Sequence, residues 1–258
     1  MPIAKKIKTI AEYISEISNI KEKFAENGNK STLLFRGQKV KTSLKPKSDS
    51  LTLFSPLEDA EKEILEEFRR GLLAFSESKQ ENNEWDLLAL AQHHGLPTRL
   101  LDWTYNPLVA LWFAIQNKNI YNYESRKDAE IWILNAESSD FEIENDTLPI
   151  NIKVTKIFRP KAISKRITAQ ASVFTAHFLS KKKNQFSALE KLTNYKSKLQ
   201  KITISFEYFE KLQEELNSIG INNSTMFPDL DGFCKHLEWR FSKFNELKPK
   251  RRSQNENI

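Results

Sequence analysis

The chain has 258 residues, of which 39% are hydrophobic and 11% aromatic, so it is long and apolar enough to bury a sizeable core. Its single cysteine, Cys234, excludes an internal disulfide framework and a cysteine-based zinc site, and favours the reducing cytoplasm as the compartment. No apolar run approaches the roughly 20 residues that a membrane-spanning helix needs, so we expect no membrane partner. The net charge of +6 favours a nucleic acid or another polyanion as a partner; a basic protein without such a partner is the alternative.

Apolar residues at helical spacing, together with residues that cap helix ends, predict the helices. Asn106 and Pro107 suit the cap and first turn of a helix, whereas Gly28, and Gly95 followed by Pro97, suit helix ends. The predicted helices cover residues 10–26, 58–76, 85–94, 107–116 and 207–218, and a last one begins near residue 231.

Short runs rich in β-branched and aromatic residues predict strands over residues 31–37, 129–135, 154–160, 172–179 and 201–206. Helices and strands therefore mix without a clean βαβ alternation, which predicts an α+β fold with small mixed or antiparallel sheets flanked by helices. We expect a single main domain over residues 31–247. An N-terminal helix within residues 1–30 would pack on this domain, and residues 248–258 would form a basic, disordered tail.

The segment LLALAQHHGLPTRLLDWTYNPLVALWFAI, residues 87–115, is the most hydrophobic part of the chain and yet contains several polar side chains. The helix over 85–94 is apolar on two faces, so we expect it to be buried, with His93 and His94 at its C-terminal end beside a cleft or a polar network. A histidine that only caps the helix is the alternative. Adjacent side chains diverge by about 100° on a helix, so these two cannot hold one metal ion, and we expect no metal site.

Arg99 and Asp102 lie three residues apart and could pair with each other across a turn. A buried arginine–aspartate pair costs desolvation energy, so it is retained more readily where it shapes a site than for stability alone. A structural contact between two helices is the alternative.

Common catalytic motifs are missing from the chain. No Gly-x-Ser-x-Gly elbow and no glycine-rich phosphate loop are present, which excludes ordinary serine hydrolases and ordinary nucleotide-loop folds. In FPDLDG, Asp229 and Asp231 could be paired carboxylates at a cleft. Alternatively, Asp231 caps the last helix while Asp229 stabilises the turn after Pro228.

Four blocks of the sequence, LLFRGQ, LALAQHHGLPTRLLDWTYNPLVALWFA, RITAQASVF and MFPDLDGFCKHL, resemble the FRG-domain family, named for its Phe-Arg-Gly motif. They occur in the family's order between about residues 31 and 237. The third block departs from the family, because Ala171 and Ser172 stand where a Gln-Gly pair is commoner. FRG domains occur in bacteria and their viruses, and several resemble parts of anti-phage or toxin modules.

The chain also resembles, more distantly, the ADP-ribosyltransferases, which implies that NAD is a substrate. In that resemblance Arg36 and Gly37 match the Arg-Gly that opens the NAD site, Trp103 and Thr104 match a later strand end, and Gln170 matches a loop Glu or Gln. Arginine suits a bidentate contact with pyrophosphate, and glycine permits close approach of a ligand to the backbone.

The resemblance further implies that Thr104 and His94 contact ribose and that Trp103 or Trp112 stacks on a ring of the substrate. Gln170 cannot supply the carboxylate that stabilises a cationic ribosyl transition state, so Asp102, Asp229 or Asp231 would have to do so.

These arguments predict one set of site residues. The expected catalytic residues are Arg36, Asp102 and Gln170, and the expected binding residues are Gly37, Gln38, His94, Arg99, Trp103, Thr104, Asp229 and Asp231.

The first functional hypothesis is an NAD-consuming, ADP-ribosyltransferase-like toxin or anti-phage effector with a nucleic-acid or protein acceptor. The second is a non-catalytic module that binds a nucleotide or RNA and signals through a partner protein. The third is a toxin-like subunit that an antitoxin holds inactive. All three agree that the segment over residues 87–115 lines a site.

Overall fold

A computed structural model describes residues 7–26, 31–53, 55–75, 83–116, 127–142, 147–161 and 165–243. At its centre is a six-stranded sheet in the order β4-β5-β2-β1-β3-β8, and every ladder in it is antiparallel. These strands are β1 (Ser31–Gln38), β2 (Leu100–Thr104), β3 (Ala129–Glu137), β4 (Lys156–Phe158), β5 (Ser172–Ala176) and β8 (Leu199–Ile204). A separate pair is formed by β6 (Leu179–Ser180) and β7 (Gln185–Phe186).

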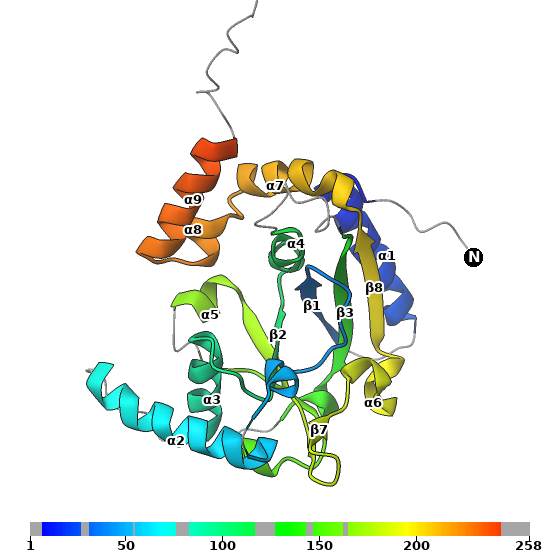
Figure 1. The fold of residues 1–258 in the computed structure, drawn as a ribbon. Helices are drawn as coiled ribbons and strands as arrows, with labels where there is room; N and C mark the ends of the chain where they lie inside the picture. Colours follow the sequence, from blue (N-terminus) through cyan, green and yellow to red (C-terminus); the bar gives the residue numbers. More distant parts are fainter. Residues whose placement is uncertain are drawn as a thin grey trace, which may run out of the picture.

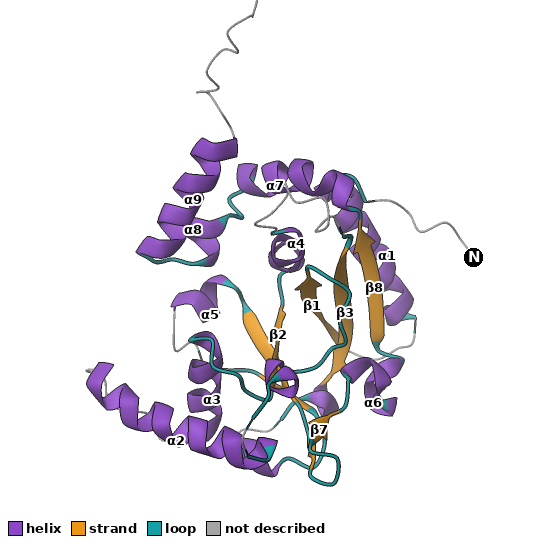
Figure 2. Cartoon of the chain, in the orientation of Figure 1, coloured by secondary structure: helices purple, strands orange, loops and turns teal. Residues whose placement is uncertain are grey.

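Helices surround this sheet, so the predicted α+β class is confirmed (Figure 2). In the described residues they are α1 (Ile10–Ala25), α2 (Leu57–Phe75), α3 (Glu84–His93), α4 (Pro107–Ile115), α5 (Lys165–Ala169), α6 (Thr193–Lys196), α7 (Phe209–Ser218), α8 (Asn223–Met226) and α9 (Leu230–Lys243). None of them is long and apolar enough to cross a membrane.

Local sequence signals explain where the helices begin and end. The Asn106 side chain accepts a hydrogen bond from the backbone N–H of Leu108, and Pro107 opens α4, as predicted. Gly95 follows α3 with a φ of 88°, a left-handed conformation that suits glycine. The cap predicted at Gly28 and the tail predicted over 248–258 lie outside the described residues.

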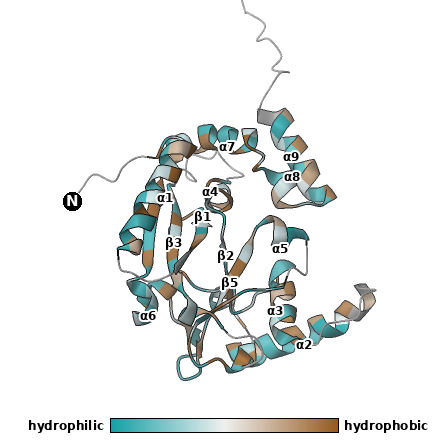
Figure 3. Ribbon diagram, turned by 180° about the vertical axis from the view of Figure 1, so that it is seen from behind, coloured by the Kyte–Doolittle hydropathy of each residue, from teal (hydrophilic) through white to brown (hydrophobic). Residues whose placement is uncertain are grey.

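Apolar side chains cover the two faces of the sheet in separate clusters. On one face α4 packs on β1 and β3, and α1 and α7 complete the same cluster, which includes Tyr13, Phe35 and Leu212. On the other face Leu34 and Trp103 join a second cluster. The N-terminal helix α1 therefore shares a core with the sheet. In Figure 3 brown, apolar positions mark the sides of the helices that face the sheet.

The sheet is nearly split between β1 and β2. These strands share a single residue pair, Phe35 with Thr104, whereas β1 pairs with β3 along its whole length from Ser31 to Gln38. Figure 1 shows β2 standing apart from β1 and β3, with α4 above the gap between them. The backbone groups of residues 100–103 that face β1 therefore need hydrogen-bond partners other than those of a strand ladder.

Two predicted elements differ from the structure. The strand predicted over residues 172–179 ends at Ala176, and Leu179 belongs to the separate short strand β6. The turn expected around Asp102 is instead strand β2, which pairs with β5 along its whole length. Its run LLDWT is buried on both faces except at Asp102, and therefore lacks the alternation that marks a half-buried strand.

Candidate functional site

Asp102 is an exposed carboxylate in the middle of an otherwise buried inner strand. The other four residues of β2 are buried, while the Asp102 side chain is 57% exposed. At one end of β2, Leu100 packs with Leu88 of α3, and at the other end Phe35, the partner of Thr104, packs under α4. Asp102 lies between these two contacts. Its side chain is nevertheless exposed to solvent.

Arg36 binds Asp102 from the neighbouring strand. Its Nη1 donates to the Asp102 backbone carbonyl at 2.7 Å and lies 3.7 Å from the carboxylate Oδ2. The guanidinium thus takes a carbonyl that a continuous β1–β2 ladder would have used. Burial lowers the pKa of Arg36 and the Asp102 charge opposes this, but an arginine stays protonated in proteins. A fixed positive charge therefore lies against the exposed carboxylate.

Gln92, at the end of α3, holds the Asp102 carboxylate from a second side. Its Nε2 donates to both carboxylate oxygens, at 3.2 and 3.1 Å. Thr98 Oγ1 accepts from the Leu100 N–H, so its own proton is free to donate to Gln92 Oε1, at 2.8 Å. With its oxygen engaged in this way, the Gln92 amide must turn its NH₂ toward Asp102. The network therefore presents Asp102 with donors, which favours the ionised carboxylate.

A second arginine, Arg166 of α5, faces the same carboxylate. Its guanidinium carbon lies 4.4 Å from the centre of the Phe227 ring, and its Nη1 donates to the His93 carbonyl at 3.4 Å. Burial lowers the pKa of Arg166, while the charges of Asp102 and Asp229 raise it. Asp102, together with Arg36, Gln92, His93, Arg166 and Phe227, is called the Asp102 site below.

His93 in this site is neutral at physiological pH. Burial, and to a smaller extent the positive charge of Arg166, lowers its pKa to about 4. A neutral imidazole donates through one ring nitrogen and accepts through the other. His94 is exposed, caps α3 through its backbone and lies beside Phe68, with ring centres 6.3 Å apart.

Several residues expected to bind substrate use their polar atoms within the fold. The Trp103 ring is buried and its Nε1 donates to Thr175 Oγ1 at 3.1 Å, so the expected stacking is not available. Thr104 Oγ1 donates to the Gln170 carbonyl and accepts from the Asn106 N–H. The Gln170 amide in turn donates to the Met226 carbonyl at 3.0 Å. Thr104 and Gln170 therefore connect β2, α5 and α8.

Gly37 and Gln38 also have structural contacts. A Cβ on Gly37 would lie 2.0 Å from the Ala110 carbonyl oxygen, so this glycine permits close approach of α4, not of a ligand. Gln38 is buried, and its Oε1 accepts from Trp132 Nε1 at 3.1 Å.

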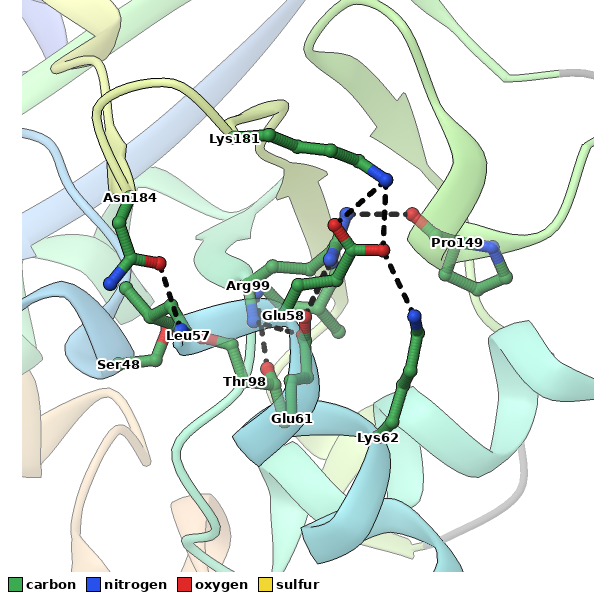
Figure 4. Close-up of polar contacts among 11 residues, drawn as sticks. Ser48, Leu57, Glu58, Glu61, Lys62, Thr98, Arg99, Pro149, Lys181 and Asn184 are labelled. Carbon is green, nitrogen blue, oxygen red and sulfur yellow. Dashed lines mark hydrogen bonds and ion pairs between the residues drawn. The ribbon is translucent and has the colours of Figure 1, made fainter. Parts of the chain in front are cut away.

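The predicted pairing of Arg99 with Asp102 is wrong, because Arg99 pairs with Glu61 of α2. Arg99 Nη2 and Glu61 Oε2 are 2.6 Å apart, with both side chains 2% exposed. Figure 4 shows the pair, with a further bond from Arg99 to the Pro149 carbonyl at 3.0 Å. Successive side chains of a strand point to opposite faces, so Arg99 and Asp102 point away from each other. Arg99 therefore attaches α2 to the end of β2.

The two aspartates of FPDLDG have different positions. Asp229 Oδ1 accepts from the Gly232 N–H at 2.7 Å, so it caps α9 and takes the role expected of Asp231. Asp229 also borders the Asp102 site, since its charge acts on both His93 and Arg166. Asp231 is exposed in the first turn of α9.

Ala171, in the third block, has a φ of 45°, in the left-handed region that favours glycine. The turn that leads from α5 into β5 thus keeps its shape with a strained alanine.

The structure adds Gln92, His93, Arg166 and Phe227 to the expected site residues Arg36 and Asp102. Arg166 opens the block RITAQASVF and Phe227 lies in MFPDLDGFCKHL, so the recurrence of these blocks was the signal that could have found them. Within the described residues, no group of three His, Cys, Asp or Glu side chains could hold a metal ion.

Residues 31–122 match the family model of the FRG domain. No curated protein and no solved structure matches the chain. The matched segment supplies β1, β2 and α4 but not β3 or β5, which pair with β1 and β2, so the folded unit extends beyond the match.

Proposed function

Because residues 31–122 match the FRG-domain model and the chain holds an exposed carboxylate near two arginines, we propose that it is an ADP-ribosyltransferase-like enzyme. It would consume NAD in the cytoplasm and act as a toxin or an anti-phage effector. The acceptor of the ADP-ribose would be a nucleic acid or a protein, and an antitoxin partner would restrain the activity.

The observation that carries this proposal is the position of Asp102. A carboxylate on an inner strand would normally be covered, but this one is open to solvent and held by Arg36 and Gln92. Such a preorganised negative charge stabilises a cation that develops beside it. Arg36 and Arg166 supply the guanidinium groups that suit a pyrophosphate.

In the proposed reaction the bond between the ribose C1′ and the nicotinamide nitrogen breaks, and its electron pair leaves with neutral nicotinamide. The ribosyl cation that remains lies against Asp102. A nucleophilic oxygen or nitrogen of the acceptor then bonds to C1′ and loses its proton to solvent. Asp102 thereby takes the role that Gln170, an uncharged amide, cannot take.

A second candidate function is a module that binds a nucleotide without turning it over. Trp103, Thr104 and Gly37 favour it, because their contacts lie within the fold and leave fewer groups for ribose and nicotinamide than the resemblance implies.

The experiment that tests the proposal is release of nicotinamide from NAD, measured by chromatography with total RNA, single-stranded DNA or cell protein as acceptor. We expect acceptor-dependent release by the wild type and at least about a hundredfold less by Asp102→Asn, because a preorganised charge contributes on this scale. Asp59→Asn, at another exposed aspartate, is the matched control and should release nicotinamide at the wild-type rate. Absence of release with every acceptor, while ADP-ribose still binds, would establish the second candidate instead.

A further inference from the structure

Two adjoining hollows lie at the end of the sheet where β1 begins and β3 and β4 end. The first, of about 560 Å³, includes Thr32 and Arg159, and the second, of about 460 Å³, includes Asn151 and Lys153. Both are lined by Ser138, Phe141 and Glu142, so they adjoin, and together they are called the Phe141 groove below. Its residues belong to none of the contacts that hold Asp102.

Positive side chains predominate among the described residues of the Phe141 groove. These residues include four cationic side chains, Lys153, Lys156, Arg159 and Lys161, and one carboxylate, that of Glu142. Lys161 also lies 3.5 Å from the Asp86 carboxylate. The cations lie in both hollows, with Arg159 and Lys161 in the first and Lys153 and Lys156 in the second. Such a spacing suits an extended polyanion better than a single phosphate group.

Aromatic rings lie among these charges. Phe141 is half-buried where the two hollows meet, and the Arg159 guanidinium carbon lies 5.4 Å from its ring centre. Arg159 is fixed further by Tyr105, whose ring centre lies 5.6 Å away and whose hydroxyl accepts from Arg159 Nε at 3.0 Å. A held guanidinium and an adjacent ring provide flat surfaces on which unpaired bases stack.

From this combination we propose that the Phe141 groove binds single-stranded nucleic acid, with phosphates on the lysines and a base on Phe141 or Arg159. A duplex keeps its bases stacked inside, so it would not use the aromatic ring. An acidic peptide would use the charges but not the ring.

Phe141 and Tyr105 pack on the cluster of Leu34 and Trp103, whereas the Asp102 side chain points to the opposite face of the sheet. The groove is therefore separate from the Asp102 site. The inference goes beyond the proposed function, since it assigns a nucleic-acid site that does not use Asp102. Binding to the groove is measured without NAD, so failure of one proposal is distinguishable from failure of the other.

The test is the anisotropy of a fluorescent twelve-nucleotide single-stranded RNA, titrated with protein over a series of salt concentrations. For each phosphate contact removed, the slope of log affinity against log salt should fall by about 0.7. Lys153→Gln should produce this change, whereas Lys182→Gln, in the β6–β7 turn, should leave the slope unchanged. Phe141→Leu should weaken binding about tenfold at an unchanged slope, because it removes stacking and no charge.

Two results would overturn the inference. One is equal loss in Lys153→Gln and Lys182→Gln, which would mean that binding depends on net charge alone. The other is competition by polyglutamate as effective as competition by unlabelled RNA, which would identify the groove as a site for acidic peptides. Thermal unfolding of each variant ensures that only folded protein is compared.

Discussion

Two arginine–carboxylate pairs, Arg99 with Glu61 and Arg36 with Asp102, each have one member in residues 99–102, but their surroundings are opposite. Arg99 and Glu61 are each 2% exposed, while Arg36 and Asp102 are 22% and 57% exposed. In the buried pair, which joins α2 to β2, two guanidinium N–H groups of Arg99 donate to Glu61 Oε2, and the Pro149 carbonyl accepts a third bond from Arg99. The open pair lies at the split between β1 and β2.

This difference in exposure assigns a structural role to the buried pair and a role in ligand binding to the exposed pair. The two charges of a buried ion pair are already desolvated and hydrogen-bonded to each other, so the pair is not available to a ligand. An exposed carboxylate held by two donors can still accept a cationic partner. The two pairs are connected, because Thr98, which precedes Arg99, orients Gln92, which in turn holds Asp102. The closed region therefore positions the open one.

The largest expected effect is on the free energy of unfolding, which should depend on the buried pair much more than on the exposed pair. Glu61→Gln leaves the Arg99 charge buried without a counter-charge, and we expect a loss of about 3–5 kcal/mol in the free energy of unfolding. Asp102→Asn, the matched change in the open pair, should cost less than about 1 kcal/mol, because solvent reaches that carboxylate. Urea unfolding of both variants measures the difference, and equal losses would contradict the comparison.

The next effect concerns pH and His177, which is buried beneath the site. Trp103 Nε1 donates to Thr175 Oγ1, and this hydroxyl oxygen lies 3.1 Å from His177 Nε2. Burial lowers the pKa of His177 to about 3, below its ordinary value of 6.5. The contribution of neutral His177 to the free energy of unfolding is fully present above pH 6.5. It is lost as the pH falls toward 3, at up to about 1.4 kcal/mol per pH unit.

Urea unfolding at pH 7.5, 6 and 5 measures that dependence. His177→Gln should flatten the slope between pH 6.5 and 5, whereas His94→Gln, at an exposed histidine, should preserve it. A wild-type stability that does not change across this interval would show that His177 is protonated in the folded protein.

A smaller effect tests the connection between the two regions. Thr98→Val removes the donor that orients Gln92, so NAD turnover should fall about tenfold through kcat, as expected for one lost hydrogen bond near a charge. Thr98→Ser keeps the hydroxyl and should retain most of the activity. Steady-state kinetics of folded protein provide the readout, and equal rates for the two variants would mean that Gln92 needs no such orientation.

The smallest expected effect is a gain. Ala171→Gly relieves a left-handed alanine between α5 and β5, and should raise the free energy of unfolding by about 0.5–1 kcal/mol. Thermal unfolding measures it, with Ala169→Gly in α5 as a control that should be destabilising. Equal effects of the two substitutions would indicate that position 171 carries no strain.

Local signals in the sequence were sufficient for most of the helices. Asn106 and Pro107 begin α4 because a cap and a first turn depend only on neighbouring residues. Strand β2 was less accessible to prediction, since it is buried on both faces except at Asp102 and the ladder that defines it comes from β5, about 70 residues later.

The site was predictable in part for the same reason. Arg36 and Asp102 stood out by residue type and position, but the partner of Arg99 did not, because Glu61 lies 38 residues away on a helix chosen by tertiary packing. Arg166 reaches the site only through the path of α5, which the sequence pattern does not specify. Contacts between distant segments thus decide which polar residues face solvent.

The most direct test of the account is the affinity of the protein for ADP-ribose, measured by isothermal titration calorimetry. The wild type should bind, and Arg36→Gln and Arg166→Gln should each weaken binding at least about tenfold, because each removes a charge-assisted contact with the pyrophosphate. Arg70→Gln, at an exposed arginine of α2, should leave the affinity unchanged. Equal affinity in all four proteins, or no binding by the wild type, would contradict the assignment of the Asp102 site as a nucleotide site.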